Sequence, residues 1–177
     1  HNFNVLFRNN PKYDVVCSTA AQIPGIEKRT SPKVLCGRLY KKPIPIYSEK
    51  LLPQLIKRFK VDEVYLSYSD LLVDEVLQKQ SLVKKVKTAK KGAEPAKFLL
   101  TPAKETILKS TKPVIAVCAV RTGCGKSSVS QKIAGYIKSL GKRIVVVRHP
   151  MPYGDLTKQI CQRYKTYKDL EKNLSKI

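Results

Sequence analysis

The predicted fold is decided by the stretch Val114-Ile115-Ala116-Val117-Cys118-Ala119-Val120-Arg121-Thr122-Gly123-Cys124-Gly125-Lys126-Ser127. Its first part is an apolar run rich in Val and Ile, which is typical of a strand covered on both faces. Two glycines follow and indicate a tight turn, and Lys126-Ser127 then starts a helix. A strand, a glycine turn and a helix start in this order favour a phosphate-binding loop.

The residues that follow this stretch complete one βαβ unit. Apolar residues recur at about one helical turn and predict an amphipathic helix: Val129, Ile133, Ile137 and Leu140. Gly141 suits the left-handed residue that ends a helix. The apolar run Ile144-Val145-Val146-Val147 then predicts a second buried strand. The sequence therefore predicts the first βαβ unit of a P-loop NTPase domain.

A phosphate-binding loop needs these residue types for physical reasons. Glycines have no Cβ, so their amides approach an anion closely, while the helix N-terminus adds its positive dipole end and Lys126 adds a full charge. The predicted nucleotide-binding residues are Gly123, Cys124, Gly125, Lys126, Ser127 and Ser128. Val120 stands where the common pattern G-x-x-x-x-G-K-[ST] has glycine. The alternative is a glycine turn of another α/β unit, in which Lys126 is merely solvated.

Further site residues are expected beyond the second strand, because ligands of open α/β sheets bind outside the carboxyl ends of the strands. Arg148 offers bidentate contacts to a phosphate or carboxylate, and His149 offers a proton or a hydrogen bond. Asp155 is expected to help Ser127 hold Mg²⁺. Arg121 resembles, by its place, the signature lysine of a subclass of dimeric P-loop enzymes, with simple exposure to water as the open alternative. The predicted catalytic residues are Lys126, Arg121, Arg148 and His149.

Several longer runs resemble one family, the archaeal cyclic 2,3-diphosphoglycerate synthetases and their relatives described as GTPases. The run from Lys112 to Ser127 is similar to that family's nucleotide loop, and the run from Val145 to Leu156 is similar to the segment after it. Shorter matches are Ala21-Gln22-Ile23-Pro24-Gly25-Ile26, Ile44-Pro45-Ile46-Tyr47, Asp62-Glu63-Val64 and Tyr68-Ser69-Asp70. The resemblance covers nearly the whole chain.

The resemblance implies a nucleotide-driven closure of 2,3-diphosphoglycerate, or a reaction of another phosphorylated metabolite, with ATP or GTP and Mg²⁺ as cofactors. It also implies a chain truncated at both ends, since the sequence opens at His1 and no later strand that ends in an acidic Mg²⁺ ligand follows Asp155. The alternative is a non-catalytic module that binds nucleotide or polyanion and needs a partner subunit or a second copy.

Composition limits the class of protein. The 177 residues are 42% apolar, which suffices for a core, and no apolar run approaches the roughly 18 residues of a membrane span. Five scattered cysteines without metal-ligand spacing indicate reduced thiols in a cytoplasm. The net charge of +22 favours an anionic ligand or a lysine-rich solvated surface. Since the lysines are spread along the chain, nucleic acid is the weaker prediction.

The residues before the glycine turn predict a separate α/β domain. Strands are expected at 13–20 and 64–68, a short extended piece between Pro43 and Pro45, and a further strand at 98–100. Helices are expected near Phe3–Phe7, from Ser48 to Phe59 and after Ser69-Asp70. The predicted domains are a Rossmann- or flavodoxin-like one with a mostly parallel sheet at 1–103, lacking its first strand, and the partial P-loop domain at 104–177.

Overall fold

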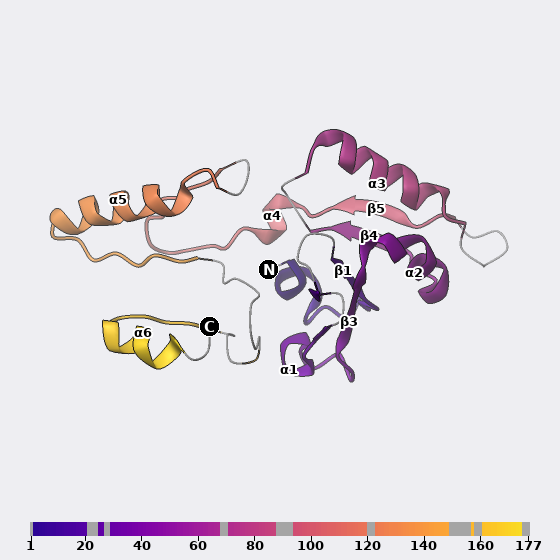
Figure 1. Ribbon diagram of the computed structural model, residues 1–177, viewed down its shortest axis with the longest axis horizontal. Coiled ribbons are helices and arrows are strands. Elements are labelled where there is room, and N and C mark those ends of the chain that lie inside the picture. The colour runs from indigo at the N-terminus through magenta and orange to yellow at the C-terminus, as the bar shows by residue number, and fades with distance from the viewer. Residues whose placement is uncertain are drawn as a thin grey trace.

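The structure, a computed structural model, describes residues 2–20, 25–26, 29–67, 71–87, 94–119, 123–148, 157 and 161–174. Strands and helices alternate through the first part of the chain, and two helices follow in the second (Figure 1). The strands are β1 Ser18–Ala20, β2 Thr30–Ser31, β3 Ile44–Ser48, β4 Glu63–Leu66 and β5 Lys97–Leu100. The helices are η1 Phe3–Phe7, α1 Lys33–Cys36, η3 Glu49–Leu51, α2 Leu52–Phe59, α3 Val73–Lys85, α4 Ala103–Thr106, α5 Lys126–Ser139 and α6 Tyr167–Leu174.

The described strands form two small sheets, which are partly parallel. In the first, β1 pairs in parallel with β3, and β2 pairs with β3 in the antiparallel direction. In the second, β4 and β5 run in parallel, with Glu63 opposite Lys97 and Leu66 opposite Leu100. The prediction of a mixed α/β fold is confirmed at this level. The finer Rossmann or flavodoxin assignment is not established, because the described strands do not join into one sheet.

The larger core cluster lies where α2 and α3 pack beside the β4–β5 pair (Figure 1). Its buried members are Ile56, Val83, Val86 and Ala96, against which Leu52, Val61, Val64 and Phe98 pack. The helix α2 forms here because its apolar residues recur at helical spacing, and Pro53 is tolerated in its first turn. Lys60, at φ 51°, ends the helix in the left-handed region.

A second core cluster joins the N-terminal helix to the first sheet. Cys36, Tyr40 and Ile44 are buried there, and Phe3 and Val15 pack against them. Gly37 is needed beside this cluster because its φ of 90° and ψ of −177° suit only glycine. A Cβ at this position would also lie 2.9 Å from Cγ of Arg8. The backbone therefore passes close to η1, which keeps the first helix against the sheet.

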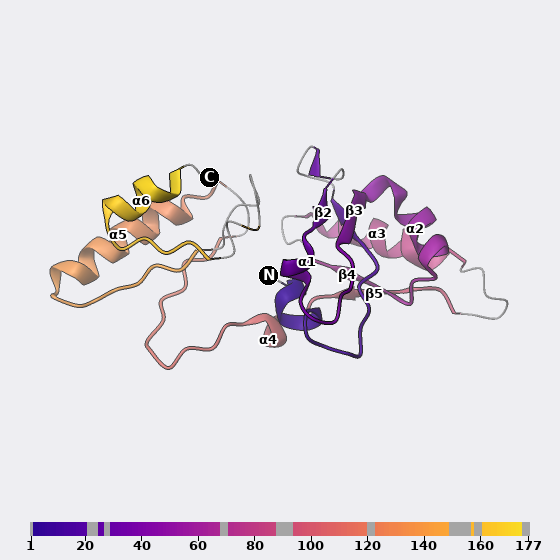
Figure 2. The same cartoon turned by 90° about the horizontal axis from the view of Figure 1, so that it is seen from below.

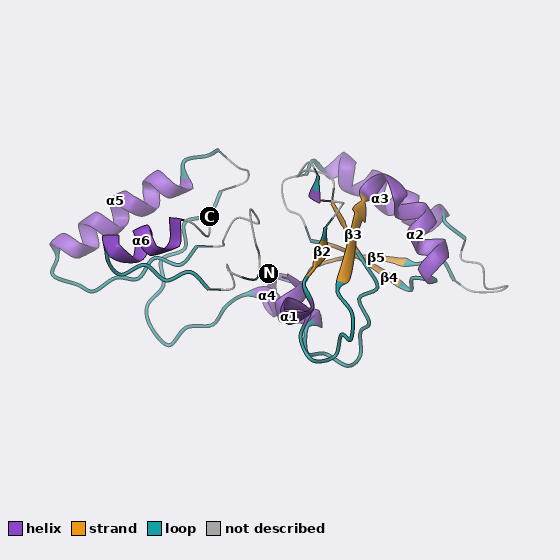
Figure 3. Cartoon of the chain, turned by 60° about the horizontal axis from the view of Figure 1, so that its bottom comes forward, coloured by secondary structure: helices purple, strands orange, loops and turns teal. Residues whose placement is uncertain are grey.

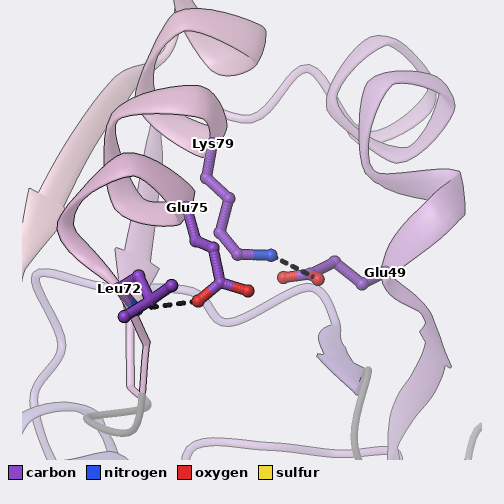
Figure 4. Close-up of polar contacts among 4 residues, drawn as sticks. All are labelled: Glu49, Leu72, Glu75 and Lys79. Carbon is purple, nitrogen blue, oxygen red and sulfur yellow. Dashed lines mark hydrogen bonds and ion pairs between the residues drawn. The ribbon is translucent and has the colours of Figure 1, made fainter.

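The start of α3 corrects one detail of the sequence analysis. Ser69-Asp70 was expected to cap this helix, but Leu72 holds the N-cap position, and Ser69-Asp70 lie outside the described residues. The Glu75 carboxylate accepts a hydrogen bond of 2.7 Å from the Leu72 amide (Figure 4). Beside it, the Lys79 ammonium donates to the Glu49 carboxylate of η3. The Glu75 contact stabilises the start of α3, and the Lys79–Glu49 contact ties α3 to η3, which follows β3.

The second half of the chain lies apart from this packed body in all three views (Figures 1, 2 and 3). The helix α5 agrees with the predicted helix, and Gly141 follows it at φ 71°. The predicted strands at 114–120 and 144–147 are wrong for the described residues, because residues 113–119 and 142–148 belong to no strand. Their side chains are largely exposed, so neither segment is the buried strand that its sequence predicts.

Candidate functional site

The candidate site is the glycine turn at the start of α5. Gly123 and Gly125 both have positive φ, at 84° and 75°, and Gly125 occupies the N-cap position of the helix. A side chain other than glycine would strain the backbone at either position. Among the described residues, a Cβ at either glycine would meet no atom within 4 Å, so no close backbone approach requires these glycines. Both glycines thus have the backbone conformation that a tight turn requires, and the role of the turn in binding phosphate stays a prediction.

Three amides of the turn carry no backbone hydrogen bond in the part of the chain that the structure describes. Among the described residues, no backbone hydrogen bond uses the N–H groups of Cys124, Ser127 or Ser128 as donors. The first amide that donates into the helix is that of Val129, which bonds to the Gly125 carbonyl at 3.0 Å. No acidic side chain lies in the first turn of α5. The positive end of the helix dipole therefore faces the same space as these amides.

The side chains of the turn present one charge and two hydroxyl groups. Lys126 is the first residue of α5 and is half-buried, while Ser127 and Ser128 are exposed. The Lys126 carbonyl accepts a hydrogen bond of 2.8 Å from the Ser130 hydroxyl, which stabilises the first turn of the helix. A lysine at this place supplies a full positive charge next to the open amides, and Ser127 adds a hydroxyl that suits Mg²⁺.

The structure brings only part of the predicted site together. Arg148 is described, and it is an exposed residue at the end of the extended segment 142–148. Arg121, His149 and Asp155 lie outside the described residues. In the part of the chain that is described, no three His, Cys, Asp or Glu side chains gather as a metal site. The second cation, the proton carrier and the acidic Mg²⁺ ligand therefore stay predictions.

A hollow between α2 and α3 was not singled out from the sequence. It is open to solvent, has a volume of about 690 Å³ and has a mostly apolar lining that includes Pro53, Leu82 and Val86. Lysines from both helices and from the residue after Val86 also line it: Lys57, Lys85 and Lys87. The only signal in the sequence was the lysine-rich end of α3, which was interpreted as a solvated face.

Sequence reasoning also missed a cluster of aromatic side chains at η1 and β4. The rings of Phe7, Tyr13 and Tyr65 lie with their centroids 5.0 to 6.1 Å apart. The Tyr65 hydroxyl donates to the Glu63 carboxylate at 3.0 Å and lies 3.3 Å from the Tyr13 hydroxyl. Burial first, and then these two hydrogen bonds, raise the pKa of Tyr65. No regular spacing in the sequence signals this cluster, because its members come from distant positions.

The architecture and the turn together define a mixed α/β protein with small, partly parallel sheets and an open glycine turn at a helix start. None of the described helices is long and apolar enough to cross a membrane. No protein-family model matches the chain, and no solved structure matches it either.

One curated protein is clearly similar to the chain: arginine synthetase ArcE from Thermococcus kodakarensis. The two sequences are 49% identical over 172 residues. The match covers 97% of this chain and 37% of the relative's length. Because the match extends over nearly the whole chain, it includes the candidate turn at 123–128 and both extended segments beside it.

This similarity overturns the assignment made from the sequence alone. The resemblance to cyclic 2,3-diphosphoglycerate synthetases and P-loop GTPases is wrong, because the protein matched over 97% of the chain is an arginine synthetase. The implied reaction on 2,3-diphosphoglycerate and the GTPase activity are wrong as well, and the alternative of a non-catalytic binding module is not better supported. The runs that carried the resemblance include the glycine turn with its following lysine, which is a local solution to anion binding and does not specify the reaction.

Proposed function

We propose that this chain serves in an ATP-dependent synthetase of arginine formation, and that the turn at 123–128 binds the phosphates of Mg-ATP. The observation that carries the proposal is the 49% identity to an arginine synthetase over 97% of the chain. A synthetase drives the formation of a bond with a nucleoside triphosphate, so it needs a site for a highly charged anion. The chain spans 37% of the relative's length, so the activity of the whole protein is part of this proposal.

The geometry of the turn supports the place given to the phosphates. Its open amides, its two glycines of positive φ and the helix start all face the same uncrowded space. Lys126 adds the charge that a phosphate oxygen requires, and charge-assisted hydrogen bonds of this kind are the strongest available to the site. The Ser127 hydroxyl fits the way in which Mg²⁺ is usually held, by few protein ligands together with phosphate oxygens and water.

The chemistry that the chain's own residues supply is binding and charge neutralisation. When a phosphoryl group is transferred, negative charge is spread over its oxygens, and fixed donors and cations stabilise it there. Mg²⁺ would neutralise part of the charge on the phosphates when bound. Amides held by a helix start need no reorganisation to do the same, and Lys126 is part of that rigid start. Arg148, Arg121 and His149 are the further candidates for contacts to the transferred group.

The test is a calorimetric titration of the chain with Mg-ATP, repeated with Mg-GTP and with arginine. We expect ATP to bind and Lys126→Ala to weaken it by about 10- to 100-fold, because the variant loses a charge-assisted contact of about 1.5 to 3 kcal/mol. Lys138→Ala is the matched control, since it removes an equal charge from the last turn of the same helix. Equal binding by both variants, or a preference for GTP, would contradict the proposal.

A further inference from the structure

Two apolar segments on either side of α5 lack any partner in the described structure. Residues 113–119 lead into the glycine turn, and residues 142–148 leave the helix at its other end. The exposed fractions of their large side chains are high: Val114 70%, Ile115 64%, Val145 85%, Val146 59% and Val147 82%. Soluble proteins rarely expose apolar side chains in such continuous runs, so these segments mark an interaction surface.

The backbone of these segments is also open. Among the described residues, no backbone hydrogen bond joins 113–119 or 142–148 to another strand. The one backbone contact at the edge of this region joins the Lys142 amide to the Ile137 carbonyl, at the end of α5. An extended segment of this kind presents a row of donors and acceptors that a neighbouring strand can pair. A partner that pairs with these segments is therefore expected to contribute a β-strand.

The side chains say what kind of strand each segment would be. In an extended segment, Val145 and Val147 point to one side and Ile144 and Val146 to the other, so both sides are apolar. That pattern belongs to an inner strand of a sheet that is covered on both faces. The helix α5 can cover one face only, and its apolar residues Val129 and Leu140 are themselves exposed. The other face and the strand edges need material that the described residues do not supply.

We propose that segments 113–119 and 142–148 become inner strands of a sheet whose remaining strands come from polypeptide equivalent to the unmatched part of the arginine synthetase. More than half of that relative's length has no counterpart in this chain, which is ample for the missing strands. The matched part shares 49% of its residues with this chain, so a surface that fits the rest of the relative is expected to be retained. This inference stands independently of the turn's ligand.

The experiment compares amide hydrogen exchange in two proteins. The first is this chain alone, and the second is the full-length relative in which this chain replaces the 172 matched residues. We expect the amides of 113–119 and 142–148 to exchange at least tenfold more slowly in the full-length chimera. The amides of β4 and β5 serve as an internal standard, since they are already paired in this chain.

Charged variants identify the surface that causes the protection. Val145→Lys combined with Val147→Lys should raise the exchange rates of the amides of 113–119 and 142–148 in the chimera at least tenfold. The exchange rates of β4 and β5 should not change. Val73→Lys at the start of α3 is the matched control, because Val73 is comparably exposed but lies in the other half of the chain. If the chimera does not fold, as β4 and β5 will show, the unmatched part of the relative is added to this chain as a separate polypeptide.

Three outcomes would overturn the proposal. The first is equal protection of the segments in the monomeric chain alone, which would mean that they pair with each other. The second is protection by a second copy of this chain, which sedimentation would show as a dimer that the Val145 and Val147 substitutions break. The third is a folded chimera in which the segments remain unprotected, or a separately added polypeptide that fails to bind, which would mean that nothing in the relative covers them.

Discussion

The sharpest stability prediction concerns Ile56, which is fully buried in the core cluster between α2, α3 and the β4–β5 pair. Ile56→Ala removes the equivalent of three methylene groups at about 0.8 kcal/mol each, or about 2.4 kcal/mol of transfer free energy. Val83 is fully buried and Val86 and Ala96 nearly so, which leaves little room for collapse and adds a cavity term. We expect a loss of about 3 to 4 kcal/mol in the free energy of unfolding, and about 1 kcal/mol for Ile56→Val.

Urea unfolding followed by circular dichroism, with amide exchange at Lys97–Leu100, measures this change. The two probes are needed because circular dichroism averages over the whole chain, whereas the β5 amides report on this cluster, on which the second half of the chain is not packed. Leu72→Ala is the control, since Leu72 is strongly exposed and should change stability by less than about 0.5 kcal/mol. A loss below 1 kcal/mol for Ile56→Ala would refute the packing described for this core.

Three further predictions follow from other parts of the structure. Gly37→Ala should lower the free energy of unfolding by about 2 to 3 kcal/mol, measured by thermal unfolding. The loss should exceed that of Gly25→Ala, because both glycines have positive φ but only a Cβ at Gly37 would meet Arg8. Equal losses for the two variants would contradict this close approach. Tyr65 has its pKa raised in the folded chain, so the stability it contributes is present below pH of about 10, the unfolded value, and is lost as pH rises further. Ultraviolet titration should show a late tyrosine step, to which Tyr40 also contributes because burial raises its pKa. Tyr65→Phe should reduce the amplitude of this step, and an unchanged amplitude in the variant would contradict the assignment. The exposed thiols of Cys118, Cys124 and Cys161 should react with iodoacetamide in the folded chain, whereas buried Cys36 should react only after unfolding, as peptide mass analysis would show.

The helices were predictable from the sequence because their apolar residues recur with the period of the structure. Leu52, Leu55 and Ile56 mark the buried face of α2, and Gly141 marks the end of α5, as local propensity requires. The start of α3 was less predictable, since Ser69-Asp70 offered a stronger capping signal than Leu72. Leu72 holds the N-cap position, and the Glu75 carboxylate accepts a hydrogen bond from its amide. A contact to a side chain three residues further along is harder to predict from the sequence than a Ser or Asp cap.

The glycine turn was predictable for a different reason. Gly123 and Gly125 need their residue type because the backbone there adopts positive φ, and this local requirement is visible in the sequence. What the turn serves was not predictable, since the same amides, dipole and lysine fit any phosphate-bearing ligand. The wrong family assignment came from treating the resemblance of several runs, this turn among them, as if it specified a reaction, and the similarity to arginine synthetase corrects it.

The apolar runs on either side of α5 show the limit of this kind of reasoning most clearly. The apolar run Ile144-Val145-Val146-Val147 is typical of a strand that is covered on both faces, and it predicted a buried strand of a sheet within this chain. The exposed apolar side chains still favour burial, but the sequence of a strand does not indicate which polypeptide packs against it. Hydrogen bonds between strands are non-local, so a strand forms only where its neighbour is present. The exposed valines are therefore consistent with the sequence pattern.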